Sequence, residues 1–77
     1  MSNADLDSAI IITAARFYAL HRDEDTLRAC IEDAIDHLIL TFTNLAMTHT
    51  LASLYRYIQR EGAIEGLVED FESALGL

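Results

Sequence analysis

The sequence predicts an all-α protein, a bundle of three to four helices in one domain spanning residues 1–77. Apolar residues recur at helical spacings of three and four through most of the chain. Pro is absent, and the three glycines all lie at position 62 or later, so little interrupts helices before that point. The segment 38–43 could alternate as a strand, but no second strand is evident to pair with it. Residues 1–4 contain Ser-Asn-Ala, which resembles a remnant of tag removal, and we expect them to be such a remnant or disordered.

The first helix is expected from about residue 5 to residue 20. Asp5 and Asp7 lie near its positive end, and Arg16 and Arg22 lie toward its negative end, as the helix dipole favours. Apolar residues occupy nearly its whole circumference. A helix of this kind is buried on several sides. Its main apolar face is predicted to hold Leu6, Ile10, Phe17 and Leu20.

The second helix is expected from about residue 24 to residue 47, with Asp23 or Asp25 as its N-terminal cap. One apolar stripe along it consists of Leu27, Ile31, Ala34, Leu38, Phe42 and Leu45. A second stripe on the opposite side, which we call the seam, consists of Leu40, Asn44, Met47, Leu51, Leu54 and Ile58. Its alternating spacings of four and three are typical of a helix that packs lengthwise against another helix.

Two interpretations are open for the region after residue 47. Thr48 or Thr50 could cap a new helix after a tight turn, which would give a four-helix bundle within one chain. Alternatively, the helix continues through residue 60 and is roughly 55 Å long. We favour the continuous helix because no Gly or Pro interrupts it and the seam crosses the region in phase. A second copy of the chain would then cover the seam, with Asn44 fixing the register of a homodimer.

The C-terminal third carries the clearest helix signals. Gly62 stands where a left-handed helix cap is expected, after Arg56 and Arg60. The last helix is predicted over residues 63–75. Its buried face should consist of Ile64, Leu67, Val68, Phe71 and Leu75. Its outer face should carry Glu65, Glu69, Asp70 and Glu72.

The composition limits the classes of partner. The chain has 13 acidic and 5 basic residues, a net charge of -8, and this charge disfavours binding to nucleic acid or to anionic membranes. The uncharged stretch 38–55 is too polar to span a lipid bilayer. The one cysteine, Cys30, cannot form an internal disulfide, and no leader is evident, so we expect a cytoplasmic location. The 52% of hydrophobic residues exceeds what so small a core needs, which favours a homodimer.

The residues that could carry chemistry form no recognisable site. Asp33 and His37 lie four apart on one helix, a spacing that can hold a metal ion, but di-metal sites in bundles need Glu-x-x-His pairs from two helices. We therefore favour a solvated ion pair. Cys30 is interpreted as a buried, inert thiol, and the serines lack the context of a nucleophile. We expect no catalytic residue, no metal and no cofactor.

The leading functional hypothesis is a non-enzymatic protein-protein interaction module, a small acidic homodimer that acts as an adaptor, inhibitor or assembly factor. The alternative is a regulator linked to nucleic acid, which contacts DNA through Arg56 and Arg60 or mimics DNA through its acidic faces. As candidate ion-pair or anion contacts, these two arginines are expected to pair with carboxylates rather than to read DNA. The carboxylates would belong to a partner or, across a dimer, to Glu61, Glu65 and Glu69. A third hypothesis is a carrier that holds a small apolar ligand among Phe17, Phe42 and Phe71.

Overall fold

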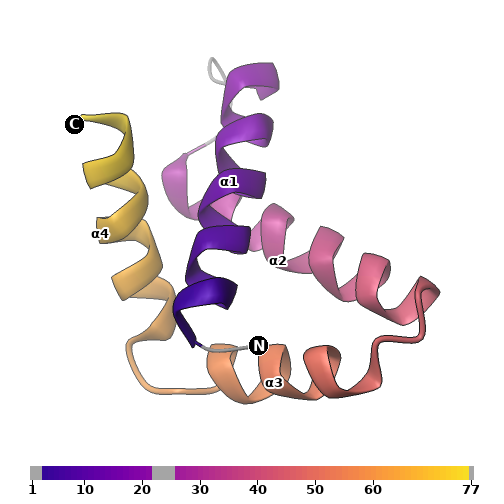
Figure 1. Cartoon of the computed structure of the whole chain (residues 1–77). Helices are drawn as coiled ribbons and strands as arrows, with labels where there is room; N and C mark the ends of the chain where they lie inside the picture. Colours follow the sequence, from indigo (N-terminus) through magenta and orange to yellow (C-terminus); the bar gives the residue numbers. More distant parts are fainter. Residues whose placement is uncertain (1–2, 22–25, 77) are drawn as a thin grey trace.

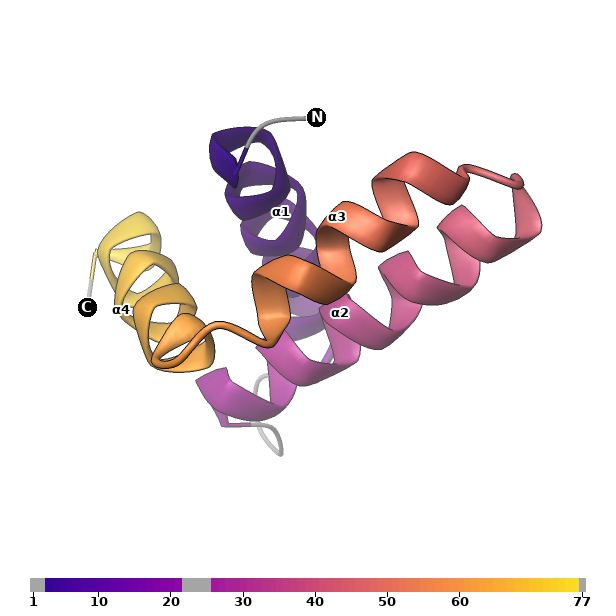
Figure 2. The same ribbon diagram turned by 90° about the horizontal axis from the view of Figure 1, so that it is seen from below.

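The all-α prediction is confirmed by the computed structural model, which describes residues 3–21 and 26–76. Within these residues the chain forms four helices: α1 (Asn3–His21), α2 (Leu27–Asn44), α3 (Thr48–Ile58) and α4 (Ala63–Leu75). Helices α2 and α3 run antiparallel as a hairpin, and α1 and α4 pack against α2 (Figures 1 and 2). The result is a compact bundle made by a single chain.

Helix α1 contributes one buried row to the core. Leu6, Ile10 and Ala14 are fully buried, and Phe17 is half-buried. Leu20, which the periodicity placed on the same face, is exposed because it lies in the last turn of the helix. The helix begins at Asn3, two residues before the predicted start.

Helix α2 begins later than predicted, and its N-terminal cap is Thr26. The Thr26 hydroxyl accepts a hydrogen bond of 3.1 Å from the backbone N–H of Ala29. Thr26 directly precedes the first helical residue, so its oxygen reaches the third amide of the helix. The prediction of Asp23 or Asp25 as the cap is therefore wrong, and both aspartates lie outside the described residues.

The prediction of one continuous helix through residue 60 is also wrong. Helix α2 ends at Asn44, and the chain turns at Ala46, whose φ of 55° lies in the left-handed region. The backbone N–H of Met47 donates to the carbonyl of Phe42 at 2.9 Å, and that of Ala46 donates to the carbonyl of Thr43 at 3.1 Å. These two bonds form a Schellman motif, which ends helices in this way. Its left-handed position usually holds Gly, and because Ala stands there the sequence lacks the usual signal for this turn. The alternative of a four-helix chain is thus correct, although the N-terminal cap of α3 is Met47 and not Thr48 or Thr50.

The second turn follows the sequence prediction more closely. Gly62 has a φ of 76°, as expected for a left-handed position. It directly precedes α4, however, while α3 already ends at Ile58 with Gln59 as its C-terminal cap. The predicted inner face of α4 is confirmed: Leu67 and Phe71 are buried, and the other three residues are half-buried against the core.

The core lies where α1, α2 and α4 meet, with a smaller contribution from α3. Among the described residues, its buried side chains are Leu6, Ile10, Ala14, Cys30, Ile31, Ala34, Ile35, Leu38, Phe42, Leu54, Leu67 and Phe71. Tyr18 closes one end, with its ring edge-on to Phe71 at a centroid distance of 5.9 Å. No helix in the described part of the chain combines the length and the apolar character needed to cross a membrane.

Candidate functional site

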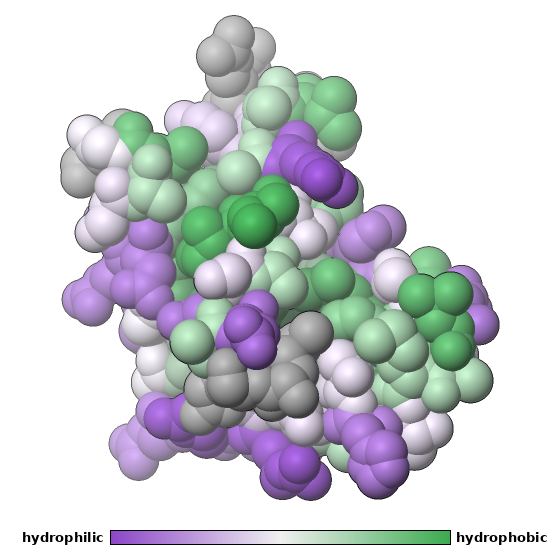
Figure 3. Space-filling model, in the orientation of Figure 1, coloured by the Kyte–Doolittle hydropathy of each residue, from purple (hydrophilic) through white to green (hydrophobic). Residues whose placement is uncertain are grey.

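The free end of the α2–α3 hairpin exposes large apolar side chains. We call residues 40–51 the hairpin tip, and residues 27–39 together with 52–58 the hairpin base. At the tip, the exposed fractions are 59% for Leu40, 64% for Leu45 and 36% for Met47. Apolar side chains gather over this end of the molecule in the space-filling view (Figure 3). Exposed apolar clusters of this kind are typical of interaction surfaces.

The hairpin tip also differs in charge from the rest of the molecule. All 13 acidic residues lie outside residues 37–60, and the tip itself carries no formal charge. The only arginines in that segment, Arg56 and Arg60, lie beyond the tip along the chain. The protein is therefore acidic around α1, the first half of α2 and α4, and neutral at the tip.

The six seam residues do not share one helix face, because the turn at Ala46 divides them. Leu40, Asn44 and Met47 are exposed at the tip, and Leu51 is half-buried there. Leu54 is fully buried in the hairpin base, where it belongs to the chain's own core. The sixth residue, Ile58, is half-buried near the start of α4. The structure thus brings four of the six residues together at the tip.

The two candidate anion contacts, Arg56 and Arg60, are both exposed and make contacts within the chain. Arg56 Nη2 donates to Ser53 Oγ at 3.3 Å. The Arg60 guanidinium lies over the Tyr57 ring, 5.7 Å from its centroid, a cation–π geometry. Pairing of these arginines with Glu65 across a dimer stays a prediction.

Within the chain, Glu65 accepts a hydrogen bond from a different arginine, Arg28. Arg28 donates to Glu65 Oε1 and to Glu32 Oε1, each at 3.2 Å. A hydrogen bond from the backbone of Glu65, followed by the one from Arg28, lowers the pKa of the Glu65 carboxyl. This pair links α2 to α4 on the outer surface of the bundle. Both side chains are more than half exposed, so water screens their attraction.

A polar junction that the sequence did not predict joins α1, α3 and α4. The Tyr57 hydroxyl donates to Asp7 Oδ1 across 50 positions of sequence. Burial, together with the negative charge of Asp70 and a hydrogen bond to it, raises the pKa of the Asp7 carboxyl, while the positive charge of Arg60 opposes the rise. No local spacing signals a contact between residues so far apart in the chain.

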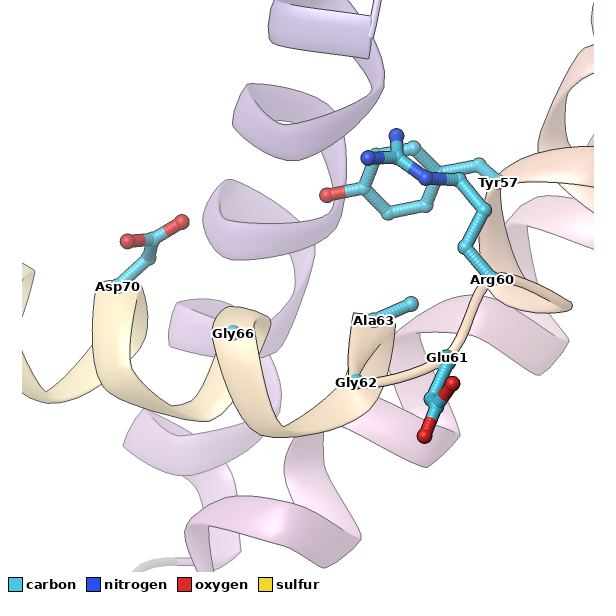
Figure 4. Close-up of a pocket in the computed structure, with 7 residues that line it drawn as sticks. All are labelled: Tyr57, Arg60, Glu61, Gly62, Ala63, Gly66 and Asp70. Atoms are coloured by element: carbon cyan, nitrogen blue, oxygen red, sulfur yellow. The ribbon is translucent and has the colours of Figure 1, made fainter.

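A small pocket of about 170 Å³ opens beside this junction. It is lined by Tyr57, Arg60, Glu61, Gly62, Ala63, Gly66 and Asp70 (Figure 4). Arg60 lies against the Tyr57 ring on one side of the pocket, and Asp70 projects from α4 on the other (Figure 4). The two charges of opposite sign, on Arg60 and Asp70, compensate each other in part.

The other side chains that could carry out catalysis or bind a metal do not lie together. Cys30 is buried in the core, and the ring of the exposed His37 lies edge-on to Phe17 at 5.9 Å. In the described part of the chain, no three His, Cys, Asp or Glu side chains are grouped so that they could hold a metal ion. Phe42 and Phe71 are packed into the core, and no phenylalanine lines the pocket beside the polar junction.

Comparison of the chain with models of protein families, with curated proteins and with solved structures gives no match. The site must therefore be interpreted from its own geometry.

Proposed function

We propose that this protein is a non-enzymatic interaction module that forms a homodimer through its hairpin tip. The observation that carries the proposal is the exposed apolar cluster Leu40, Leu45 and Met47 on a segment without carboxylates. Burial of apolar surface is the main favourable term in most protein association. An adaptor, an inhibitor or an assembly factor would use such a dimer as its scaffold.

Electrostatic repulsion between two copies of the chain favours contact at their tips over contact at any other surface. Each copy carries a charge of -8, so two copies repel each other wherever acidic faces meet. At the tip no acidic side chain approaches its equivalent, because residues 37–60 contain neither Asp nor Glu. A two-fold arrangement places the same patch of both copies in contact, which suits a surface of like, uncharged residues.

The hairpin geometry suits the same arrangement. Two antiparallel helical hairpins that pack side by side form a four-helix bundle, the common architecture for such pairs. The exposed Leu40 of α2 and the Met47 that precedes α3 would supply apolar contacts from both helices. Asn44, at the end of α2, would lie at the edge of this contact and would no longer set a coiled-coil register.

The test is sedimentation equilibrium of three proteins at about 50 µM. The unmodified chain should be a dimer, and Leu45→Gln should weaken dimerisation at least about tenfold, because it removes apolar surface from both sides of the contact. Leu20→Gln is the matched control, since Leu20 is also exposed but lies at the far end of α1 (Figure 1). Both variants keep the net charge, so only apolar surface changes.

The proposal fails if the unmodified chain is a monomer at this concentration while it melts cooperatively. It also fails if Leu20→Gln weakens dimerisation as much as Leu45→Gln does.

DNA binding, the alternative hypothesis, is tested by a separate titration. Duplex DNA at low salt should give no change in fluorescence anisotropy, because the exposed Arg56 and Arg60 are two cations on a chain of charge -8.

A further inference from the structure

We propose that a second surface, an acid-rimmed pocket at the hairpin base, binds a basic segment of a partner protein that inserts an apolar side chain next to a cationic one. The pocket has a volume of about 400 Å³ and is lined by Glu32, Ile35, Asp36, Ile58, Gln59 and Ile64. It lies where the C-terminal end of α3 and the start of α4 meet α2 (Figure 2). This surface is distinct from the tip, so the inference is independent of dimerisation.

Three isoleucines from three helices form the apolar part of this pocket. Ile35 of α2 is almost completely buried, whereas Ile58 of α3 and Ile64 of α4 are half-buried. All three also belong to the core or pack against it, so the pocket has a firm floor. A volume of this size is at the lower end of the range for binding pockets, and it suits one inserted side chain better than a large ligand. Such an insertion would remove the exposed parts of the isoleucines from water.

The rim of the pocket is acidic. Glu32 and Asp36 lie one helical turn apart on α2, and both are exposed. Arg28 already pairs with Glu32 at 3.2 Å, whereas Asp36 has no ion pair within residues 3–21 and 26–76. Asp36 can therefore pair with a cation of a partner, beside the apolar floor of the pocket. A hydrogen bond between a carboxylate and a guanidinium or ammonium group is charge-assisted and roughly twice as strong as one between neutral groups.

Charge complementarity identifies the occupant. The negative charge of the whole chain attracts a basic segment at long range, and the carboxylate of Asp36 orients it at the pocket. A second copy of this chain is a poor occupant of the acidic rim, because it carries 13 acidic residues and only 5 basic ones. The occupant we infer is thus a short amphipathic segment with Leu or a similar side chain flanked by Arg or Lys.

The test uses a dye-labelled synthetic peptide, an Ala-rich helix with one Leu and an Arg one turn away on either side of it. It is titrated with the full chain at low salt, and binding is followed by fluorescence anisotropy. We expect saturable binding that weakens as salt is added. Asp36→Asn should weaken the affinity by about twofold to fivefold, whereas Asp33→Asn should change it by less than about twofold. The two variants lose the same charge from the same helix, but Asp33 does not line the pocket.

Three results would overturn the inference. The first is the absence of saturable binding at low salt. The second is equal weakening by Asp33→Asn and Asp36→Asn, which would indicate a general attraction to an acidic protein. The third is undiminished binding of a peptide whose Leu is replaced by Asn, a result that does not depend on the folding of any variant. A monomeric chain that binds the peptide would contradict the proposed dimer and leave this inference intact.

Discussion

The two ends of the α2–α3 hairpin contain similar apolar side chains in opposite environments. At the base, Leu54 is fully buried, whereas at the tip Leu40 remains 59% exposed. Helices α1 and α4 pack against α2, and the tip extends past them (Figure 1). The difference lies in what covers each end, since both ends belong to one continuous supersecondary unit. The helices of this chain cover one end of the hairpin and leave apolar side chains exposed at the other.

The sharpest way to test this difference is to make the same substitution at both ends. Leu54→Ala should lower the free energy of unfolding by about 3 kcal/mol, because it leaves a cavity in the core. Leu40→Ala should change it by less than about 0.5 kcal/mol in the monomer, since most of that side chain is already in water. Urea unfolding at low protein concentration measures both values. A large loss for Leu40→Ala would mean that the tip is covered within the single chain.

The turn that separates tip and base gives the next largest effect. Ala46 holds a left-handed φ of 55°, which costs a residue with a Cβ about 1 kcal/mol or more. Ala46→Gly should therefore raise the free energy of unfolding by about 0.5 to 1 kcal/mol. Ala52→Gly, inside α3, is the control and should lower it by about 1 kcal/mol. If Ala46→Gly were as destabilising as Ala52→Gly, the helix would be continuous and the distinction between tip and base would disappear.

The polar junction beside the base should give the smallest effect. The raised pKa of Asp7 means that the folded chain holds this proton more tightly than the unfolded chain does. Its stabilising contribution is complete below the ordinary aspartate pKa of 3.8 and is lost as the pH rises through the raised value. Asp70→Asn removes the neighbouring charge, so it should increase stability at pH 7 by well under about 1 kcal/mol.

A pH series of urea unfolding checks this prediction, with Asp33→Asn as the control for the loss of one negative charge. The advantage of Asp70→Asn over Asp33→Asn should shrink as the pH falls toward 3.8, where Asp7 becomes protonated in both proteins. A constant advantage across the pH range would show that Asp70 does not act through Asp7.

The sequence predicted the elements that rest on periodicity and failed where the structure depends on one unusual backbone position. The inner face of α4 and the stripe through Ile31, Leu38 and Phe42 were predictable because their burial follows the 3.6-residue period. The turn at Ala46 was considered but not favoured, because its left-handed residue is not Gly. The in-phase seam was misleading, since an antiparallel hairpin can preserve the spacing of apolar residues across a turn.

The candidate sites were harder to predict from the sequence than the fold. The contact between Tyr57 and Asp7, like the pocket floor formed by Ile35, Ile58 and Ile64, joins residues from separate helices. The spacing of residues shows which of them share a face of one helix. It does not show which residues of two helices meet when the crossing of the helices is unknown. The exposed Leu40 and Met47 were predicted as interface residues, although on a longer helix than the one observed.

Amide hydrogen exchange, measured on the full chain at roughly 1 µM and 200 µM, tests most directly whether the tip is the part that needs a partner. At the higher concentration, amides of residues 40–51 should exchange more slowly, because the dimer covers them. Amides of the hairpin base and of α4 should gain no protection from contacts in the dimer, because their own chain covers them. Protection that increases with concentration on α1 or α4 instead, or tip amides that exchange equally fast at both concentrations, would contradict the account.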